Sequence, residues 1–210
     1  EDDKLTPYVE ESDLCNLLDS LESTNKELFL ATALISLFGL RLSELAVLSV
    51  QDGNLYVGHI KKNVNTSSKK REPRRAFAMD LVEKPNLGKK AIRLYESGLI
   101  KLPKAVLTQI EKVKEKNTYG DVGQAYVQIL ERNEVWKNIV KNNPDITPYS
   151  LRHRFAHQCH KGSTVPISVK DAASALGHTP ATHMNFYARY TTELSVAKAF
   201  ERHNQNRIAV

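Results

Sequence analysis

Cations, imidazoles and phenols gather in the stretch 147–190, near the carboxyl end of the chain. Arg152 is followed by His178, which comes after a Leu-Gly pair, and then by Tyr187, nine residues later. A phenol can attack a phosphodiester. The transition state spreads negative charge over oxygens that a guanidinium fork matches with two parallel hydrogen bonds. These residue types therefore favour transfer of a phosphoryl group to a tyrosine.

A second arginine lies far upstream, in the run Gly39-Leu40-Arg41-Leu42-Ser43-Glu44-Leu45. Gly39 permits a tight turn, and we expect Ser43 and Glu44 to begin a helix, where the helix dipole favours a carboxylate. Glu44 can also hold a guanidinium by a charge-assisted hydrogen bond. Taken alone, the run also fits a solvated Arg-Glu pair at a helix start.

A long basic loop separates two expected antiparallel strands, Leu55–Ile60 and Arg75–Met79. Residues 61–74 are rich in lysine and arginine and contain one acid, Glu72. A loop with this charge is expected to bind a polyanion. The cations expected to contact DNA phosphates are Lys62, Lys69, Lys70, Arg71, Arg74 and Arg75.

Taken together, these motifs resemble the catalytic domain of the tyrosine recombinase (phage integrase) family. The Gly-Leu-Arg-x-Ser-Glu-Leu run, the Leu-Arg-His segment and the Leu-Gly-His turn with its later tyrosine carry the resemblance. In that family the corresponding residues form one active site. The resemblance thus implies that Arg41, Lys61, Arg152, His178 and Tyr187 are catalytic.

The family mechanism implies a role for each residue. Tyr187 would form a 3′-phosphotyrosine, and Lys61 would protonate the departing 5′ oxygen, with Lys62 the neighbouring candidate. Tyr149 stands where the family usually has a histidine. It can hydrogen-bond a phosphate oxygen but cannot act as an imidazolium. Glu44, and His153 beside the second arginine, are expected to support the site; no cofactor or metal is expected.

Three alternatives remain open. The side chains of His153, His157, Cys159 and His160 could bind zinc, although Arg152 and Arg154 flank them and would repel a dication. A type IB topoisomerase shares the nicking and resealing chemistry. A module of the same fold could also bind DNA without cutting it.

Periodicity predicts a mainly helical domain with a small antiparallel sheet, that is, the α+β fold of the recombinase catalytic domain. Helices are expected over residues 13–22, 26–38, 150–157, 168–176, about 180–190 and 194–202, with several more between 89 and 143. We expect residues 1–210 to form a single catalytic domain, without the family's amino-terminal DNA-clamping domain. Residues 191–210 are expected to form a tail that docks on a neighbouring protomer.

Composition agrees with a nucleic-acid partner. The chain has 210 residues, a net charge of +6 and a pI near 9.2, which favours an anionic ligand such as double-stranded DNA. It has neither an 18-residue apolar run nor a secretory signal pattern. The two cysteines, far apart, suit a reducing compartment. We therefore expect a cytoplasmic, nucleoid-associated enzyme of a mobile element or resolution system that self-associates on DNA, as a tetrameric synapse.

Overall fold

The computed structural model describes residues 7–60, 72–116, 118–161 and 167–187, and positions 197, 200, 201, 204 and 205. The side chains of residues 114–116, 161, 186 and 187 lie outside this description. The elements, in chain order, are α1 (Glu11–Thr24), α2 (Lys26–Phe38), the 3-10 helix η1 (Leu42–Val47), β1 (Leu48–Gln51), β2 (Asn54–Val57), β3 (Arg74–Arg75), α3 (Leu87–Ser97), α4 (Lys104–Lys116), α5 (Tyr119–Leu130), α6 (Glu134–Asn142), α7 (Ser150–Lys161), α8 (Val169–Leu176) and α9 (Pro180–Tyr187).

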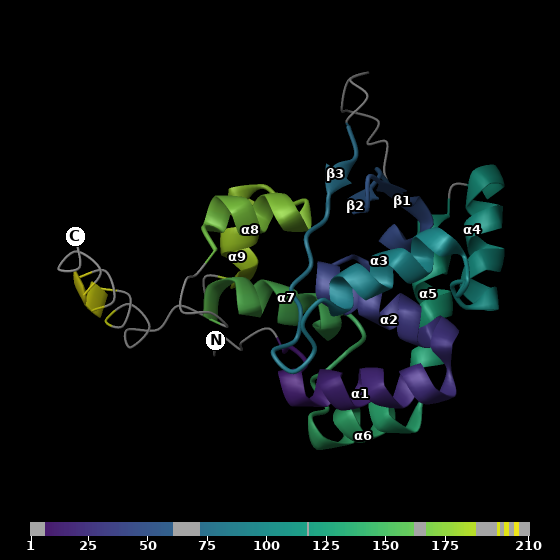
Figure 1. Ribbon diagram of the computed structural model, residues 1–210, viewed down its shortest axis with the longest axis horizontal. Coiled ribbons are helices and arrows are strands. Elements are labelled where there is room, and N and C mark those ends of the chain that lie inside the picture. The colour runs from purple at the N-terminus through teal and green to yellow at the C-terminus, as the bar shows by residue number, and fades with distance from the viewer. Residues whose placement is uncertain are drawn as a thin grey trace.

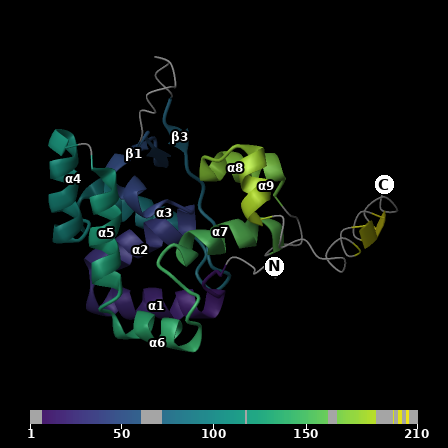
Figure 2. The same ribbon diagram turned by 180° about the vertical axis from the view of Figure 1, so that it is seen from behind.

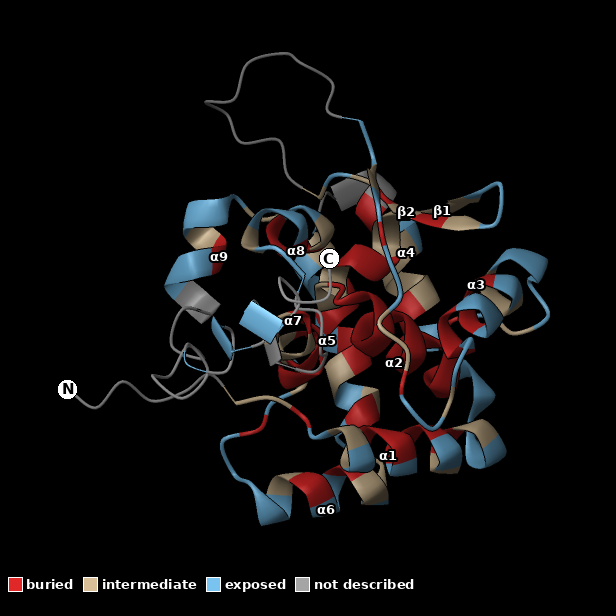
Figure 3. Ribbon diagram, turned by 60° about the vertical axis from the view of Figure 1, so that its left-hand side comes forward, coloured by how far each residue is buried: buried red, intermediate tan, exposed pale blue. Residues whose placement is uncertain are grey.

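Helix α2 is the centre of the molecule. Every residue from Leu28 to Phe38 is buried, as expected for a helix that is apolar on all faces. It packs against α1, α3, α5, α7 and η1, so other elements surround it (Figures 1 and 3). Asn25 caps its start by accepting from the Leu28 amide, and Gly39 ends it with φ 60°.

The helices divide into groups around this centre. In two opposite views, α1 and α6 lie along one edge, α4 and α5 occupy one side, and α7, α8 and α9 occupy the other (Figures 1 and 2). The main core runs from Val9 to Leu151 and includes Trp136, which is only 1% exposed. A second, smaller core under α8 contains Phe155, Ala156, Cys159, Ala172 and Leu176.

The sheet is antiparallel, with the strand order β1-β2-β3. Leu48 pairs with Val57 and Gln51 with Asn54, and β3 continues the sheet by pairing Arg74 with Val57. Asp52 and Gly53 join β1 to β2 with φ values of 50° and 70°, the left-handed geometry of a two-residue hairpin turn. The sheet places β3 near α8, where Arg74 donates a hydrogen bond to Ala175 O (Figure 1).

The fold class is the predicted one, a mainly helical chain with a small antiparallel sheet. Helix α2 has the predicted bounds, and α8 ends at Leu176 as predicted, followed by Gly177 in the left-handed region. Two strand predictions were wrong in extent: β2 ends at Val57 rather than Ile60, and β3 ends at Arg75 rather than Met79. The helix expected at Ser43 is a single 3-10 segment.

The described residues contain no helix with both the length and the apolar character needed to cross a bilayer. Most of the expected last helix, 194–202, lies outside the described residues.

Candidate active site

Arg41 and Glu44 form the first part of the site. After the turn at Gly39, Arg41 precedes η1, and its backbone amide donates to Glu44 Oε2 at 2.8 Å. Its Nη1 donates to Glu44 Oε1 at 2.9 Å. The carboxylate thus fixes both the backbone and the side chain of Arg41. The side chain of Arg41 remains 35% exposed, so it is accessible to a ligand.

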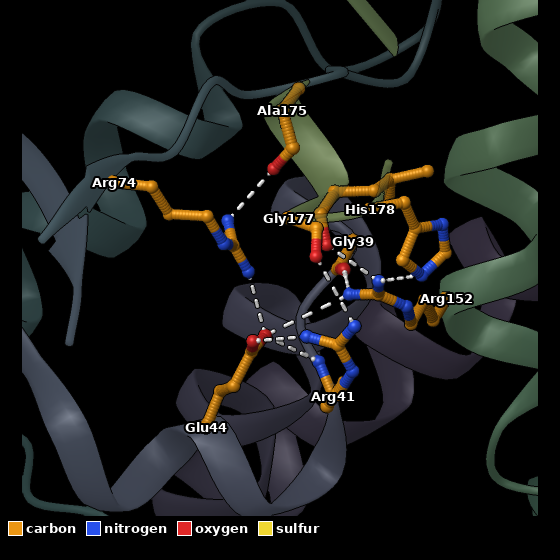
Figure 4. Close-up of polar contacts among 9 residues, drawn as sticks. Gly39, Arg41, Glu44, Arg74, Arg152, Ala175, Gly177 and His178 are labelled. Atoms are coloured by element: carbon orange, nitrogen blue, oxygen red, sulfur yellow. Dashed lines mark hydrogen bonds and ion pairs between the residues drawn. The ribbon is translucent and has the colours of Figure 1, made fainter. Parts of the chain in front are cut away.

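Arg152, in α7, reaches the same place from the other end of the chain. It is fully buried, and its Nη1 donates to Gly39 O and lies 3.7 Å from Glu44 Oε2. Its Nη2 donates to Leu176 O at 2.7 Å and lies 2.8 Å from His178 Nε2. The guanidinium therefore joins the end of α2 to the end of α8 (Figure 4).

Arg74, which was predicted to contact DNA, belongs to this cluster. Its Nη2 donates to Glu44 Oε2 and its Nη1 to Ala175 O, both at 2.7 Å, and its side chain is 17% exposed. Its place beside Glu44 was not predicted from the sequence. A usable signal was present, because successive residues of a strand point to opposite faces, so one of Arg74 and Arg75 must face inward.

Three guanidiniums thus surround one buried carboxylate. Burial by itself would raise the pKa of Glu44, but the charges of Arg74 and Arg152, and the amide and charge of Arg41, outweigh it and lower the pKa. Glu44 is therefore ionised at neutral pH. It offsets part of the positive charge and leaves a net cationic site, which suits a phosphate.

His178 is neutral in this arrangement. Burial, together with the charges of Arg152 and Arg41, lowers its pKa to about 3. Because an arginine can only donate, His178 Nε2 accepts from Arg152 and the ring proton is assigned to Nδ1. A neutral imidazole in this tautomer can donate one hydrogen bond to an anion but carries no charge of its own.

A histidine pair ties α9 to α7. His183 is buried in α9, one turn before Tyr187, and its Nε2 lies 2.7 Å from His160 Nε2. Its ring centroid is 6.0 Å from that of His178. The backbone of Tyr187 ends α9, and its side chain lies outside the described residues.

Tyr149 and His153 lie at the start of α7. Tyr149 directly precedes the helix and is 37% exposed, and its ring meets that of His153 edge to face at 5.1 Å. Burial, with the charge of Arg152, lowers the pKa of His153 to about 4. Their expected roles stay predictions.

The predicted DNA contacts are only partly described. Lys61, Lys62, Lys69, Lys70 and Arg71 lie outside the described residues. Arg75 is exposed, donates to Asn54 Oδ1 and lies over the ring of Phe77 at 5.1 Å. As for the zinc alternative, no group of three His, Cys, Asp or Glu side chains within the described part of the chain is placed to hold a metal ion.

The arrangement of helices and sheet is the tyrosine recombinase catalytic-domain fold. Among solved structures, the chain is similar to one titled "Crystal structure of XerA recombinase", with a TM-score of 0.54 and 15% sequence identity. The match covers 95% of this chain and 66% of that one. At this identity the likeness concerns the fold.

No protein-family model and no curated protein sequence matches the chain.

Proposed function

We propose that the protein is a site-specific DNA recombinase that cuts and rejoins strands through a 3′-phosphotyrosine intermediate. The observation that carries the proposal is the convergence of Arg41, Arg152 and His178 on one point beside Glu44. These residues come from three separate segments of the chain. A structural ion pair would need only one guanidinium, whereas a phosphate in transfer needs several donors.

In the proposed reaction, the phenol of Tyr187 gives up its proton to solvent water and its oxygen attacks the scissile phosphorus. A bond forms between that oxygen and phosphorus, the bond from phosphorus to the 5′ oxygen breaks, and Lys61 supplies the proton that the 5′ oxygen takes up. Arg41, Arg152 and His178 hold the non-bridging oxygens. Rejoining is the reverse, with the 5′ hydroxyl as attacking group.

The free protein has protein acceptors where the phosphate would bind. Arg152 donates to Gly39 O and Leu176 O, and Arg41 Nη2 donates to Gly177 O at a long 3.4 Å. Exchange of a neutral carbonyl for an anionic phosphate oxygen gives a stronger, charge-assisted hydrogen bond. The phosphate is therefore expected to displace the weak Arg41 bond first.

The test uses a pool of duplexes of randomised sequence. Each duplex carries a nick close to the position of cleavage. Cleavage then releases a short strand that carries the 5′ hydroxyl, and its loss prevents rejoining. Covalent complexes that survive denaturation are collected and their DNA is sequenced. We expect one sequence to be enriched, and Arg41→Ala or Arg152→Ala to reduce the adduct at least about 100-fold with non-covalent binding retained.

Arg93, exposed on α3, is the matched control: Arg93→Ala should form adduct at the wild-type rate. Failure of the wild type to form more adduct than Tyr187→Phe would contradict the proposal. With the enriched sequence in two duplexes, strand exchange indicates a recombinase, whereas nicking and resealing alone indicates the topoisomerase alternative. The mass of the protein on this DNA tests the proposed tetrameric synapse.

A further inference from the structure

Three consecutive carbonyl groups at the end of α8 each accept a hydrogen bond from a different arginine. Arg74 donates to Ala175 O at 2.7 Å, Arg152 to Leu176 O at 2.7 Å and Arg41 to Gly177 O at 3.4 Å (Figure 4). The last carbonyls of a helix have no partner within the helix and form the negative end of its dipole. The end of α8 is therefore held by cations, and His178 follows it directly.

The three arginines differ in which of their hydrogen bonds to α8 they can release. If the proposed function is correct, Arg41 and Arg152 must turn donors from these carbonyls to the phosphate during the reaction. Arg74 comes from β3, and both of its terminal nitrogens are engaged, one with Ala175 O and one with Glu44 Oε2. It is thus the arginine best placed to keep the end of α8 fixed while the other two release it.

The absence of a side chain at Gly177 allows Arg74 to pack closely against the end of α8. A Cβ built on Gly177 would lie 2.7 Å from Arg74 Nε and 3.1 Å from Arg74 Cδ. The turn before His178 therefore packs directly against the arginine side chain. Arg74 contacts both the backbone that precedes His178 and the carboxylate that orients Arg41.

We infer that Arg74 is a positioning residue of this site, which locks the His178 turn at the end of α8 onto Glu44. The inference rests on the proposed function for its catalytic meaning. Arg74 touches the groups that hold the phosphate-binding residues, so its effect is exerted through Arg41 and His178. This role is distinct from the DNA contact predicted for it from charge alone.

The first measurement needs no DNA. Histidine side-chain nitrogens are labelled in the full chain, and the tautomer and titration of His178 are followed by NMR in the wild type, Arg74→Ala, Arg74→Lys and Arg75→Ala. Loss of Arg74 should mix the two tautomers and raise the pKa of His178 toward its ordinary value. Arg75→Ala, on the exposed face of the same strand, should leave both unchanged. An unchanged His178 in Arg74→Ala would overturn the inference.

The second measurement is adduct formation at saturating duplex, with the sequence enriched from the randomised pool. Arg74→Ala should slow the step about 100-fold, the scale of a misplacement near 1 Å, with duplex affinity within about threefold of wild type. Arg74→Lys keeps the charge but cannot span Ala175 and Glu44 together. It should bind duplex and melt as the wild type does, and still cleave slowly.

Two results of the second measurement would contradict the inference. Arg74 is a phosphate contact if Arg74→Ala only weakens duplex binding and lowers, by about one, the steepness with which log affinity falls with log salt concentration. If it only lowers the melting temperature and cleaves normally below it, the role is structural. Absence of adduct in the wild type would count against the proposed function, whereas the NMR result would still decide whether Arg74 holds His178.

Discussion

Glu44 is the residue on which the site depends electrostatically. It is 4% exposed in its side chain and bonds or closely approaches three guanidiniums. Removal of one partner from a buried ionic group leaves the remaining charges uncompensated. The lowered pKa of this carboxyl means that the negative charge is present at neutral pH.

Glu44→Gln tests this charge with little change of shape. We expect it to lower the free energy of unfolding by about 3 kcal/mol and to reduce adduct formation, because Arg41 loses the group that orients it. Denaturant unfolding and the adduct assay measure the two effects. Glu134→Gln is the control: Glu134 pairs with Lys137 on the surface, and its loss should cost less than about 1 kcal/mol. Equal effects of the two substitutions would contradict the role of Glu44.

Local and specific motifs in the sequence pointed to Arg41, Arg152 and His178, and the structure brings these side chains together beside Glu44. The position of Arg74 was not predicted from the sequence. Which of two adjacent arginines faces inward depends on the register of β3 against β2, and that register is set by tertiary pairing. The pairing of His160 with His183 was also unpredicted. It joins α7 to α9, and sequence spacing does not determine how these two helices pack.

Among the elements, α8 matters most for the site. Its cap at Ser168, its end at Gly177 and its carbonyls explain where His178 lies. These end signals are local, so the sequence predicted them. Strand β1, whose four residues follow η1 directly, was not predicted from the sequence. The Asp52-Gly53 pair was the available signal for a hairpin at that point.

Gly177→Ala tests the fit between α8 and Arg74. Gly98 is a matched control: it also ends a helix with φ +66°, but a Cβ there would meet nothing within 4 Å. Gly98→Ala should lower the free energy of unfolding by about 1 kcal/mol, from backbone strain alone. Gly177→Ala should lower the free energy of unfolding by about 1–2 kcal/mol more than Gly98→Ala does, because Arg74 must leave a charge-assisted hydrogen bond. It should also slow DNA cleavage. Equal costs in thermal unfolding, with normal cleavage, would show that Arg74 does not pack as described.

Across the whole molecule, α2 acts as the scaffold that brings distant segments together. Gly39 at its end supports the turn that carries Arg41, and its packing against α7 sets the position of Arg152. The sequence predicted α2 and the fold class because an apolar helix with clear end signals is unambiguous. It did not define how the α7–α9 group sits on the body, since the small second core and the arginine bonds that hold it arise only from tertiary packing.

In the proposed mechanism, this assembly delivers the phenol of Tyr187 to a phosphate held by Arg41, Arg152 and His178. The most direct measurement is mass spectrometry of the proteolysed covalent complex, formed with the nicked duplex. We predict that the nucleotide is found on the peptide that contains Tyr187, attached through a 3′ phosphate, and that Tyr187→Phe gives no adduct while it still binds duplex. A nucleotide on Tyr190 or on any other residue would contradict the proposed mechanism.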